Sequence, residues 1–378
     1  MQLEKRFPKI PPEDFQFVQV EQALKDVNLE TKPIGFFKDA MLRLRKNKAS
    51  VIAFWIICAI SFLALFGQGF NPYTFREQDP ERANMPPRVP GIERLGILDG
   101  SSVLTNRRLE NLSDTTLYPE GSILRVFNER EVQGVKMVDV KIDQYKMRGA
   151  ENDYYWLGTD YLGRDLWTRL CRGTRVSLLI AFVAVFTNIF IGIVYGAIAG
   201  YYGGSTDMYM MRFCEVLNAF PQIVVVTMFI LFFGAGIFSI IMALVVRGWV
   251  PTARLIRAQF LRFKEREYVL AARTLGVGDM SLIFRHILPN SIGPIITRSM
   301  IAIPGAIFSE SFLAFIGLGL KAPEPSIGVL LSQGQKVLLQ YPYQTFFPAL
   351  LISVLMIAFN LFANGLRDAF DPTLRGQE

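Results

Sequence analysis

Four polar side chains interrupt stretches that are otherwise apolar, and they are the clearest candidates for chemistry in this chain. They are Arg247, Arg298, Glu310 and Asn360. A charged side chain at the middle of a bilayer costs at least about 2.5 to 3.5 kcal/mol. We therefore expect these residues to face the interior of a helix bundle, a partner subunit or water.

Glu310, within the sequence SESFLAFIGLGL, is the most deeply placed acid and has three interpretations. It is a protonated or hydrogen-bonded structural carboxyl group, a cavity residue that meets a cationic group on a ligand, or a step in a proton relay. A relay usually needs several ionisable groups in line. The sequence contains no clear chain of such groups.

Residue types that would support metal binding or nucleotide chemistry are sparse. The cysteines Cys58, Cys171 and Cys214 are far apart, and His286 is the single histidine, so neither a metal-ligand cluster nor a disulfide framework is predicted. The chain has no G-x-x-x-x-G-K-[ST] phosphate loop and no Gly-Lys pair at all. If ATP drives this protein, the ATPase must be another chain.

The composition indicates a membrane protein. Of 378 residues, 51% are hydrophobic and only 19% are charged, and the mean hydropathy is +0.29. This apolar content is high for a water-soluble fold of this length. The net charge of +7 could suggest nucleic acid, but in a membrane protein an excess of Lys and Arg more often records topology. We therefore expect a lipid bilayer and no nucleic acid.

The elements that must position the polar residues are six predicted membrane-spanning helices. Each is apolar and long enough to contribute to crossing about 30 Å of hydrocarbon. They are residues 50–67, 176–200, 216–238, 239–250 extending toward 255, 292–320 and 345–366. Residues 1–49 are mostly polar, so we expect no signal peptide before the first span.

Basic residues predict the orientation of these spans. The sequence RLRKNK precedes the first span, and residues 252–291 hold seven arginines and lysines against three acids. By the positive-inside rule both segments lie in the cytoplasm. Six spans satisfy both placements, and they put both termini in the cytoplasm and the loop from 70 to about 175 outside.

The outer loop is predicted to have two parts. Residues 70–120 are rich in Pro, Asn, Arg and Asp and are typical of irregular structure. Residues 123–142 favour β structure, because Val138, Val140 and Ile142 alternate with polar residues. The loop is either an insertion without a binding role or a docking surface for an extracellular partner.

Glycines and prolines predict how the spans pack and bend. Gly192, Gly196 and Gly200 recur every four residues on one helix face, a spacing that lets helix backbones approach closely. Pro221 and Pro304 lie in or beside spans, as does Pro348, and each should kink or bend its helix.

The most informative segment is a charged stretch between two spans. Residues 258–291, which we call the insert, include EREYVLAARTLGVGDMSLIFRHILPNS. We predict a helix over 262–275 ended by Gly276, then a short helix with Asp279 as its N-cap and Pro289 as its stop. The small Ala271 and Ala272 would let a partner approach closely, and Arg273 and Arg285 could pair with its acidic groups. Such a helix-turn-helix is shaped to be held by another protein and carries no catalytic group.

The insert resembles the EAA loop of ABC-importer permeases, in which two alanines, a later glycine and a Leu-Pro pair recur. Here these residues are Ala271, Ala272, Gly276, Leu288 and Pro289. Further stretches resemble the C-type permease subunit of dipeptide and oligopeptide importers, in the peptide/nickel transport family. They are FFKDAMLRLRKNKAS, LGTDYLGRDLWTRLCRGTRVSLLIA, GYYGGSTDMYMMRFCEVLNAFPQ and SESFLAFIGLGLKAPEPSIGVLL, in family order.

Some positions depart from the family pattern. The glutamate that gives the loop its name is replaced by Leu270, with Glu267 one turn earlier, and His286 stands where isoleucine is usual. The pair before LGTD is Tyr155-Trp156 instead of His-Pro. We expect the backbone shape set by Gly276 and Pro289 to persist.

The resemblance implies an all-α polytopic fold with six transmembrane helices of the type I ABC importer permease kind and a large extracellular insertion containing some β structure. The implied division is a cytoplasmic tail with an amphipathic segment at 1–49, a first span at 50–67, the insertion at 68–155, a permease core at 156–372 and a C-terminal tail at 373–378. The implied location is the bacterial cytoplasmic membrane.

The resemblance also implies partners and roles. The partners would be a second permease subunit, two cytoplasmic ATPases that bind ATP and Mg²⁺, and an extracellular peptide-binding protein, with no cofactor or metal in this chain. The ATPase-coupling residues would be Glu267, Ala271, Ala272, Arg273, Gly276, Asp279, Arg285, His286 and Pro289. Arg298, Glu310 and Asn360 would line the cavity. A nickel or metal-chelate importer of the same family, and a proton-driven carrier using Glu310, remain alternatives.

Overall fold

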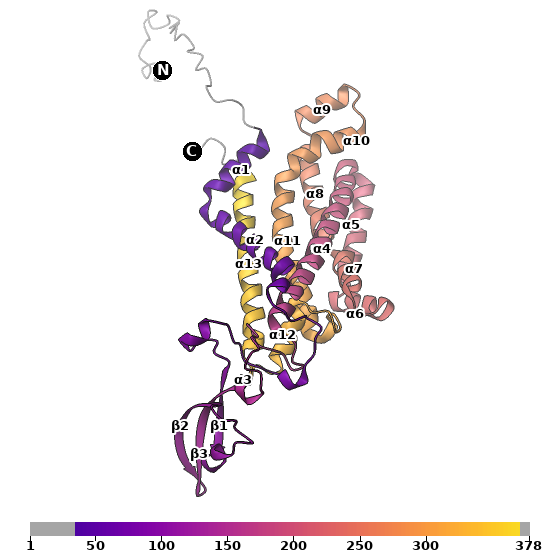
Figure 1. The fold of residues 1–378 in the computed structure, drawn as a ribbon. Helices are drawn as coiled ribbons and strands as arrows, with labels where there is room; N and C mark the ends of the chain where they lie inside the picture. Colours follow the sequence, from indigo (N-terminus) through magenta and orange to yellow (C-terminus); the bar gives the residue numbers. More distant parts are fainter. Residues whose placement is uncertain (1–34, 371–378) are drawn as a thin grey trace, which may run out of the picture. The chain divides into compact units, whose positions relative to one another are not determined.

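The computed structural model describes residues 35–370. The chain divides into two compact units, Met1–Asp39 and Ala40–Glu378, and the fold described below is that of the second (Figure 1). The predictions for the tail before residue 35 and for the tail at 373–378 lie outside the described residues.

Among these residues, five helical stretches are long and apolar enough to cross a membrane. They are Lys48–Phe70, Leu166–Tyr202, Ile237–Phe263, Asp279–Leu318 and Tyr343–Phe370. A bent pair, Gly204–Ala219 and Gln222–Phe233, makes a sixth when it is counted as one span. The predicted six spans therefore correspond to five helical stretches and one broken one.

The individual helices follow in chain order. They are α1 Phe36–Lys46, α2 Lys48–Phe66, α3 Gln144–Met147, α4 Leu166–Tyr202, α5 Gly204–Ala219, α6 Gln222–Phe233, α7 Ile237–Gly248, α8 Val250–Phe263, α9 Glu267–Thr274, α10 Asp279–Ser281, α11 Ile292–Leu313, α12 Ile327–Gln335 and α13 Tyr343–Phe370. Short 3-10 segments are η2 Gly67–Phe70, η3 Pro80–Arg82, η4 Ile92–Leu95, η5 Leu109–Ser113 and η7 Leu288–Ser291, and wide π-helical segments are η6 Leu282–Ile287 and η8 Ala314–Leu318.

The third predicted span, 216–238, is not one helix. α5 and α6 meet at a bend of 79°, and Phe220 between them has an extended backbone. Pro221 explains the break, because proline disfavours helical geometry in the residue before it. The residues between the predicted second and third spans, 201–215, are also mostly helical, since they belong largely to α5. Arg247 lies beside this break, where its Nη1 donates a 2.8 Å hydrogen bond to the carbonyl oxygen of Phe220.

α4 is longer than the predicted span at 176–200. It has 37 residues, about 55 Å at 1.5 Å per residue, so it exceeds the thickness of the hydrocarbon. Its N-cap is Asp165, whose carboxylate accepts a 2.8 Å hydrogen bond from the backbone N–H of Thr168. The sequence-based boundary began ten residues too late because the first turns of α4 contain charged residues that a hydropathy window excludes.

A row of glycines brings α4 into direct contact with α8. A Cβ atom added at Gly192 would lie 2.6 Å from Thr252 Cβ, and one at Gly200 would lie 2.6 Å from Phe260 Cβ. At Gly196 the added atom would lie 2.3 Å from the carbonyl oxygen of Ala253. The predicted close packing at this glycine spacing is confirmed, and the partner helix is α8.

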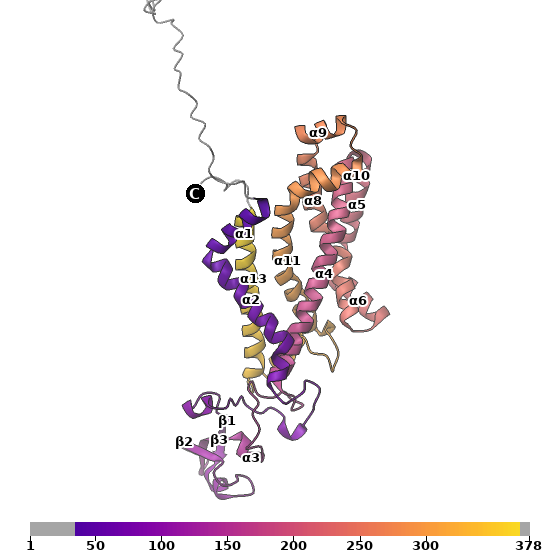
Figure 2. The ribbon, with the colours of Figure 1, turned by 45° about the horizontal axis from the view of Figure 1, so that its top comes forward.

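The other long helices pack around the same bundle. Residues of α4, α11 and α13 share one buried cluster that includes Ala181, Ile307 and Leu355. Pro304 and Pro348 lie inside α11 and α13. Figures 1 and 2 show α9 and α10 at one end of this bundle and the three β-strands beyond the other end.

The strands form a small antiparallel sheet in the order β1-β3-β2. Their bounds are β1 Ser101–Arg108, β2 Ile123–Val132 and β3 Val135–Asp143. Val138, Val140 and Ile142 are buried at 0%, 0% and 1% exposure, which confirms the predicted apolar face. β1 lies in the segment predicted to be irregular. Its sequence, SSVLTNRR, has little apolar alternation, and it is fixed as a strand by pairing with the distant β3.

A buried ionic cluster joins the N-terminal start of α4 to α12. The Asp160 carboxylate accepts hydrogen bonds from Arg164 Nε at 2.8 Å and from Arg169 Nη1, and all three side chains are 2 to 3% exposed. Arg169 Nη2 also donates a 3.0 Å hydrogen bond to Oε1 of Gln333 on α12. Each buried charge is therefore paired, as burial in a poorly solvated environment requires.

The glycine contact predicts a specific sensitivity to a single methyl group. Gly196→Ala would place Cβ against the backbone of α8, and relief of such overpacking costs about 1 to 3 kcal/mol. We expect the purified variant to unfold at a lower temperature in detergent. Gly305→Ala in α11 is the matched control, because nothing lies within 4 Å of its added Cβ. Equal melting temperatures for the two variants would contradict the close-packing interpretation.

Candidate functional site: the insert and the polar residues behind it

The insert follows a different path from the predicted one. α8 ends at Phe263 and α9 begins at Glu267, so the predicted helix over 262–275 is interrupted near its start. From Asp279 the chain is helical through α10, η6, η7 and α11 into η8, where Gly317 departs from helical geometry with a φ of +88°. The prediction that Pro289 stops a separate helix was therefore wrong. Pro289 lies in the first turn of η7, where the missing N–H of proline is tolerated.

Gly276 makes the turn between the two arms of the insert, as predicted. Its φ of +82° lies in the left-handed region that favours glycine. Its N–H donates a 3.0 Å hydrogen bond to the carbonyl oxygen of Arg273, which closes the end of α9. The N-cap of the next helix is Gly278, and Asp279 is its first residue, so the N-cap prediction for Asp279 was wrong by one position.

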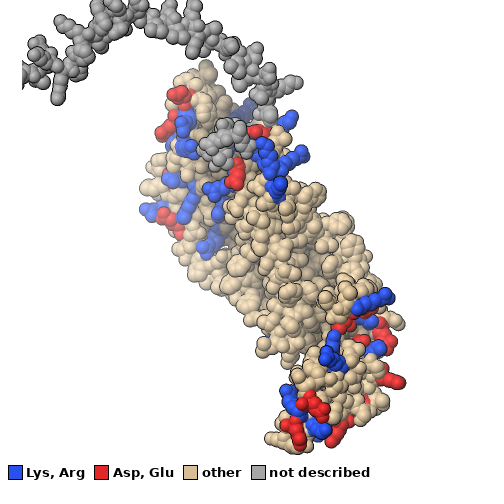
Figure 3. Space-filling model, turned by 90° about the vertical axis from the view of Figure 1, so that its left-hand side faces the viewer, with Lys and Arg blue, Asp and Glu red and all other residues tan. Residues whose placement is uncertain are grey.

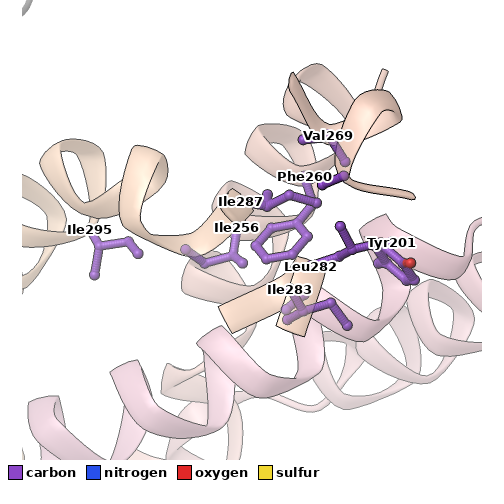
Figure 4. Packing of buried hydrophobic residues seen from close by; sticks show 10 residues of the cluster. Tyr201, Ile256, Phe260, Val269, Leu282, Ile283, Ile287 and Ile295 are labelled. Atoms are coloured by element: carbon purple, nitrogen blue, oxygen red, sulfur yellow. The ribbon is translucent and has the colours of Figure 1, made fainter. Parts of the chain in front are cut away.

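One side of the insert is an apolar core shared with the bundle. Val269 is fully buried and Ala272 is 8% exposed, and they pack in one cluster with Phe260. Figure 4 shows this cluster between the insert and the adjoining helices. The two alanines therefore have different environments, because Ala272 lies in the core and Ala271 is exposed.

A polar contact fixes the turn of the insert to α4. The Tyr201 hydroxyl donates a 2.5 Å hydrogen bond to Oδ1 of Asp279. The guanidinium carbon of Arg273 lies 5.6 Å from the centre of the Tyr201 ring, within cation–π range. Sequence reasoning identified Arg273 and Asp279 but missed Tyr201, which was visible only as part of the quoted stretch beginning GYYGG.

Two further contacts were also missed from the sequence. Asn290 Nδ2 donates hydrogen bonds to the Tyr268 hydroxyl at 3.2 Å and to the His286 carbonyl oxygen at 2.7 Å, which joins α9 to η7. Below the insert, the guanidinium of Arg257 on α8 binds both carboxylate oxygens of Asp207 on α5. These contacts fix where the insert sits without occupying its outer surface.

The outer surface of the insert combines exposed charges with exposed apolar side chains. Most of the predicted coupling residues are exposed, and His286 is half-buried. The exposed ones are Glu267, Ala271, Arg273, Gly276, Asp279, Arg285 and Pro289. Leu275 is 84% exposed, Met280 64% and Phe284 47%. Apolar groups gathered on an exposed element indicate a contact surface for another protein. A surface of this composition is suited to contact with a partner protein.

The three predicted cavity residues lie in different surroundings. Arg298 lines an open cavity of about 360 Å³ with Arg367 and Phe370, and neither Glu310 nor Asn360 is among its lining residues. Asn360 is exposed and bonds to the Met356 carbonyl oxygen of its own helix at 2.9 Å. Their contact with a transported molecule stays a prediction.

Glu310 is fully buried where three helices meet. Its Oε2 accepts a 2.8 Å hydrogen bond from the hydroxyl of Ser177 on α4, and that hydroxyl accepts the backbone N–H of Ile327 on α12 at 3.2 Å. A carboxyl group that links α4, α11 and α12 in this way supports the structural interpretation of Glu310. Within residues 35–370, no three metal-ligating side chains of the His, Cys, Asp and Glu types gather.

The Tyr201 contact yields a prediction. Tyr201→Phe removes the hydrogen bond to Asp279, and because Asp279 is exposed we expect a loss of about 1 kcal/mol. Local opening of the insert should then become about fivefold more frequent, measured as faster amide hydrogen exchange over residues 267–281. Tyr202→Phe is the control, since the Tyr202 side chain is 52% exposed. Unchanged exchange in Tyr201→Phe would show that the apolar core alone holds the insert.

Comparison with known proteins places these features in a family. Residues 192–376 match the family described as "Binding-protein-dependent transport system inner membrane component", and residues 35–87 match the "N-terminal TM domain of oligopeptide transport permease C". A chain of the inward-facing MetNI methionine ABC transporter covers 54% of this chain and 96% of its own, with 17% identity and a TM-score of 0.45.

Two curated relatives match over nearly their whole length, and a third matches over about three-quarters of its own. The oligopeptide transport system permease protein OppC of Bacillus subtilis is 33% identical over 92% of this chain and 93% of its own. The dipeptide transport system permease protein DppC of Lactococcus lactis subsp. cremoris is 36% identical over 95% of this chain and 97% of its own. The glutathione transport system permease protein GsiD of Pectobacterium atrosepticum is 36% identical over 62% and 77%. This multi-pass membrane chain therefore belongs to the binding-protein-dependent ABC-importer permease family, in its dipeptide and oligopeptide branch.

Proposed function

We propose that this chain is the transmembrane permease subunit of an ATP-driven importer of dipeptides or oligopeptides. The observation that carries the proposal is the similarity to named peptide permeases over more than nine-tenths of both chains. The exposed insert, attached to the bundle by its own apolar core, supports the same function. Such a subunit forms the pathway together with a second permease.

In this proposal the chain is not an enzyme. ATP and Mg²⁺ bind to two cytoplasmic ATPase subunits, and an extracellular binding protein delivers the peptide. The sequence supports this division of labour, because it contains no phosphate-loop motif and no Gly-Lys pair.

The insert is the proposed docking site for an ATPase. Its exposed Leu275, Met280 and Phe284 supply apolar contact area, and Arg273 and Arg285 can pair with acidic groups on the partner. Movement of the ATPases would push the insert, and the bond between Tyr201 and Asp279 would pass that movement to α4. Nucleotide would thereby bias the bundle between inward-open and outward-open states.

We place the insert and both termini in the cytoplasm and the β-sheet outside, in a bacterial plasma membrane. The basic flanks of the first span and of the insert support this orientation. Figure 3 shows charged side chains gathered toward the two ends of the visible face and a broad region between them with few charges. Such a region is suited to contact with lipid.

The direct test is purification of the tagged chain from its native membrane in mild detergent. We expect a second permease and phosphate-loop ATPases to co-purify, and we expect ATP hydrolysis to rise when peptide-loaded binding protein is added. A chain that purifies alone and without ATPase activity, even after crosslinking, would contradict the proposal.

A second test addresses coupling through the insert. Gly276→Val forces a β-branched residue into the left-handed region, which is strained for any such side chain. We expect peptide uptake to fall at least about tenfold relative to ATP hydrolysis, because a distorted turn transmits movement poorly.

Gly278→Val is the matched control for this substitution. Gly278 has φ of −69° and ψ of 154°, which valine adopts readily. Its uptake should stay near that of the unmodified protein. Equal uptake per ATP hydrolysed in Gly276→Val and Gly278→Val would exclude a role for the turn in coupling.

A further inference from the structure

A small acidic cavity lies in the outer segment of the chain, away from the insert. Its volume is about 170 Å³, and nine residues line it: Tyr73, Thr74, Glu77, Asp79, Arg82, Asp153, Tyr155, Gly163 and Asp165. They come from the chain after η2, from η3 and from the segment that leads into α4. The lining thus joins parts of the sequence about ninety residues apart.

The charges that line this cavity do not balance. Four carboxyl groups face one guanidinium, that of Arg82. Arg82 Nε lies 3.2 Å from an oxygen of Asp153 and 3.9 Å from one of Asp79. The remaining two acids, Glu77 and Asp165, form no ion pair with a described residue. The cavity therefore has the charge to accept a cation.

Asp165 is the buried acid of this lining and has an unused oxygen. Its side chain lies in the protein at 2% exposure. Oδ2 caps α4 by accepting the N–H of Thr168 at 2.8 Å, whereas Oδ1 has no hydrogen-bond partner within residues 35–370. A buried carboxylate oxygen without a partner is costly. A hydrogen-bond donor that entered the cavity would remove that cost.

The remaining wall favours an organic cation over a metal ion. The rings of Tyr73 and Tyr155 stack with centroids 4.4 Å apart, and aromatic faces attract ammonium groups. A divalent ion would need six or more oxygen ligands gathered on one point. No group of three or more such side chains gathers around one point in the described part of the chain.

We propose that this cavity is a binding site for a primary ammonium group, held by a charged hydrogen bond to Oδ1 of Asp165 and by the field of Glu77 and its acidic neighbours. The volume suits an ammonium with a short length of alkyl chain, since one water occupies about 30 Å³ in the liquid. The donor is a free amino terminus or a lysine side chain. The site goes beyond the proposed function, since it stands whatever the importer carries.

The site should depend on pH through Asp165. The pKa of this carboxyl group is raised to about 6, mainly because the group is buried. Its hydrogen bonds to Thr168 act in the opposite direction, and the nearby Asp160 adds to the increase in pKa. Arg164 and Arg169 face Asp160 and are paired with it. Below about pH 6 the Asp165 carboxyl group is mostly protonated and neutral. It then no longer attracts the ammonium group through a negative charge. Affinity should therefore fall about tenfold between pH 7.5 and pH 5, as the ionised fraction does.

The test uses the purified full-length chain with its co-purifying subunits in lipid nanodiscs. The probe is n-butylammonium chloride, followed by saturation-transfer difference NMR at constant ionic strength, with n-butanol as the neutral analogue. We expect saturable binding of the amine alone. Ala-Ala-Ala, its N-acetylated form and N-acetyl-Ala-Ala-Lys then distinguish an amino terminus from a lysine as the donor.

Substitutions in the lining test whether the amine binds in this cavity. Asp165→Asn keeps a good N-cap for α4 but should weaken amine binding about tenfold or more, because a charged hydrogen bond is lost. Glu77→Gln, at an exposed position, should weaken it less and serves as a second variant if Asp165→Asn does not fold. Glu151→Gln is the control, because Glu151 is an exposed acid two residues from Asp153 and does not line the cavity.

Three results would overturn the proposal. They are the absence of saturable amine binding, equal binding in Asp165→Asn and the unmodified protein, and equal losses in Glu77→Gln and Glu151→Gln. None of them bears on whether ATPases co-purify, so failure of this site and failure of the proposed function are distinguishable.

Discussion

The direct contact between α4 and α8 is the constraint on which the rest of this structure depends. Gly192, Gly196 and Gly200 present bare backbone to α8, and a single methyl group at any of them would overlap the facing helix. In a bilayer the hydrophobic effect does not drive helices together, so close approach and the van der Waals contact it allows must hold them. The 37-residue helix α4 is thereby joined to the helix that leads into the insert.

That contact gives the insert a rigid base. Phe260 of α8 packs against Gly200 of α4. The same phenylalanine belongs to the apolar cluster that contains Val269 and Ala272. The insert is consequently an extension of the bundle and not a loop that hangs from it. In the proposed function this matters, because force applied by an ATPase reaches the membrane only through elements that keep their shape. Gly276 permits the sharp turn. The apolar cluster around Val269 and Ala272 holds the turn in place.

Polar groups at the contacts of α4 hold neighbouring helices together. Glu310 is bonded to Ser177 where helices join, and Asp160 is enclosed by two guanidinium groups at the N-terminal end of α4. Buried charges of this kind stabilise only when each has a partner. Asp165, beside this cluster, has an oxygen without one. Glu310 likewise keeps one oxygen, Oε1, without a hydrogen-bond partner among the described residues. The buried polar residues around α4 thus serve mainly to fix helices, and Asp165 differs from Glu310 in that it lines a cavity.

Local patterns in the amino-acid sequence are enough to predict the membrane class, the approximate spans, the β character of residues 123–142, the glycine contact and the turn at Gly276. These follow from hydropathy, alternation and backbone geometry, which act over a few neighbouring residues. Pro221 also predicts a bend in the third span. The strand at Ser101–Arg108 and the contacts that hold the insert depend instead on tertiary packing. Tyr201 and Asp279 are 78 positions apart, and Arg169 and Gln333 are 164 apart. The packing of whole helices brings such distant residues into contact, so no local pattern in the sequence identifies them.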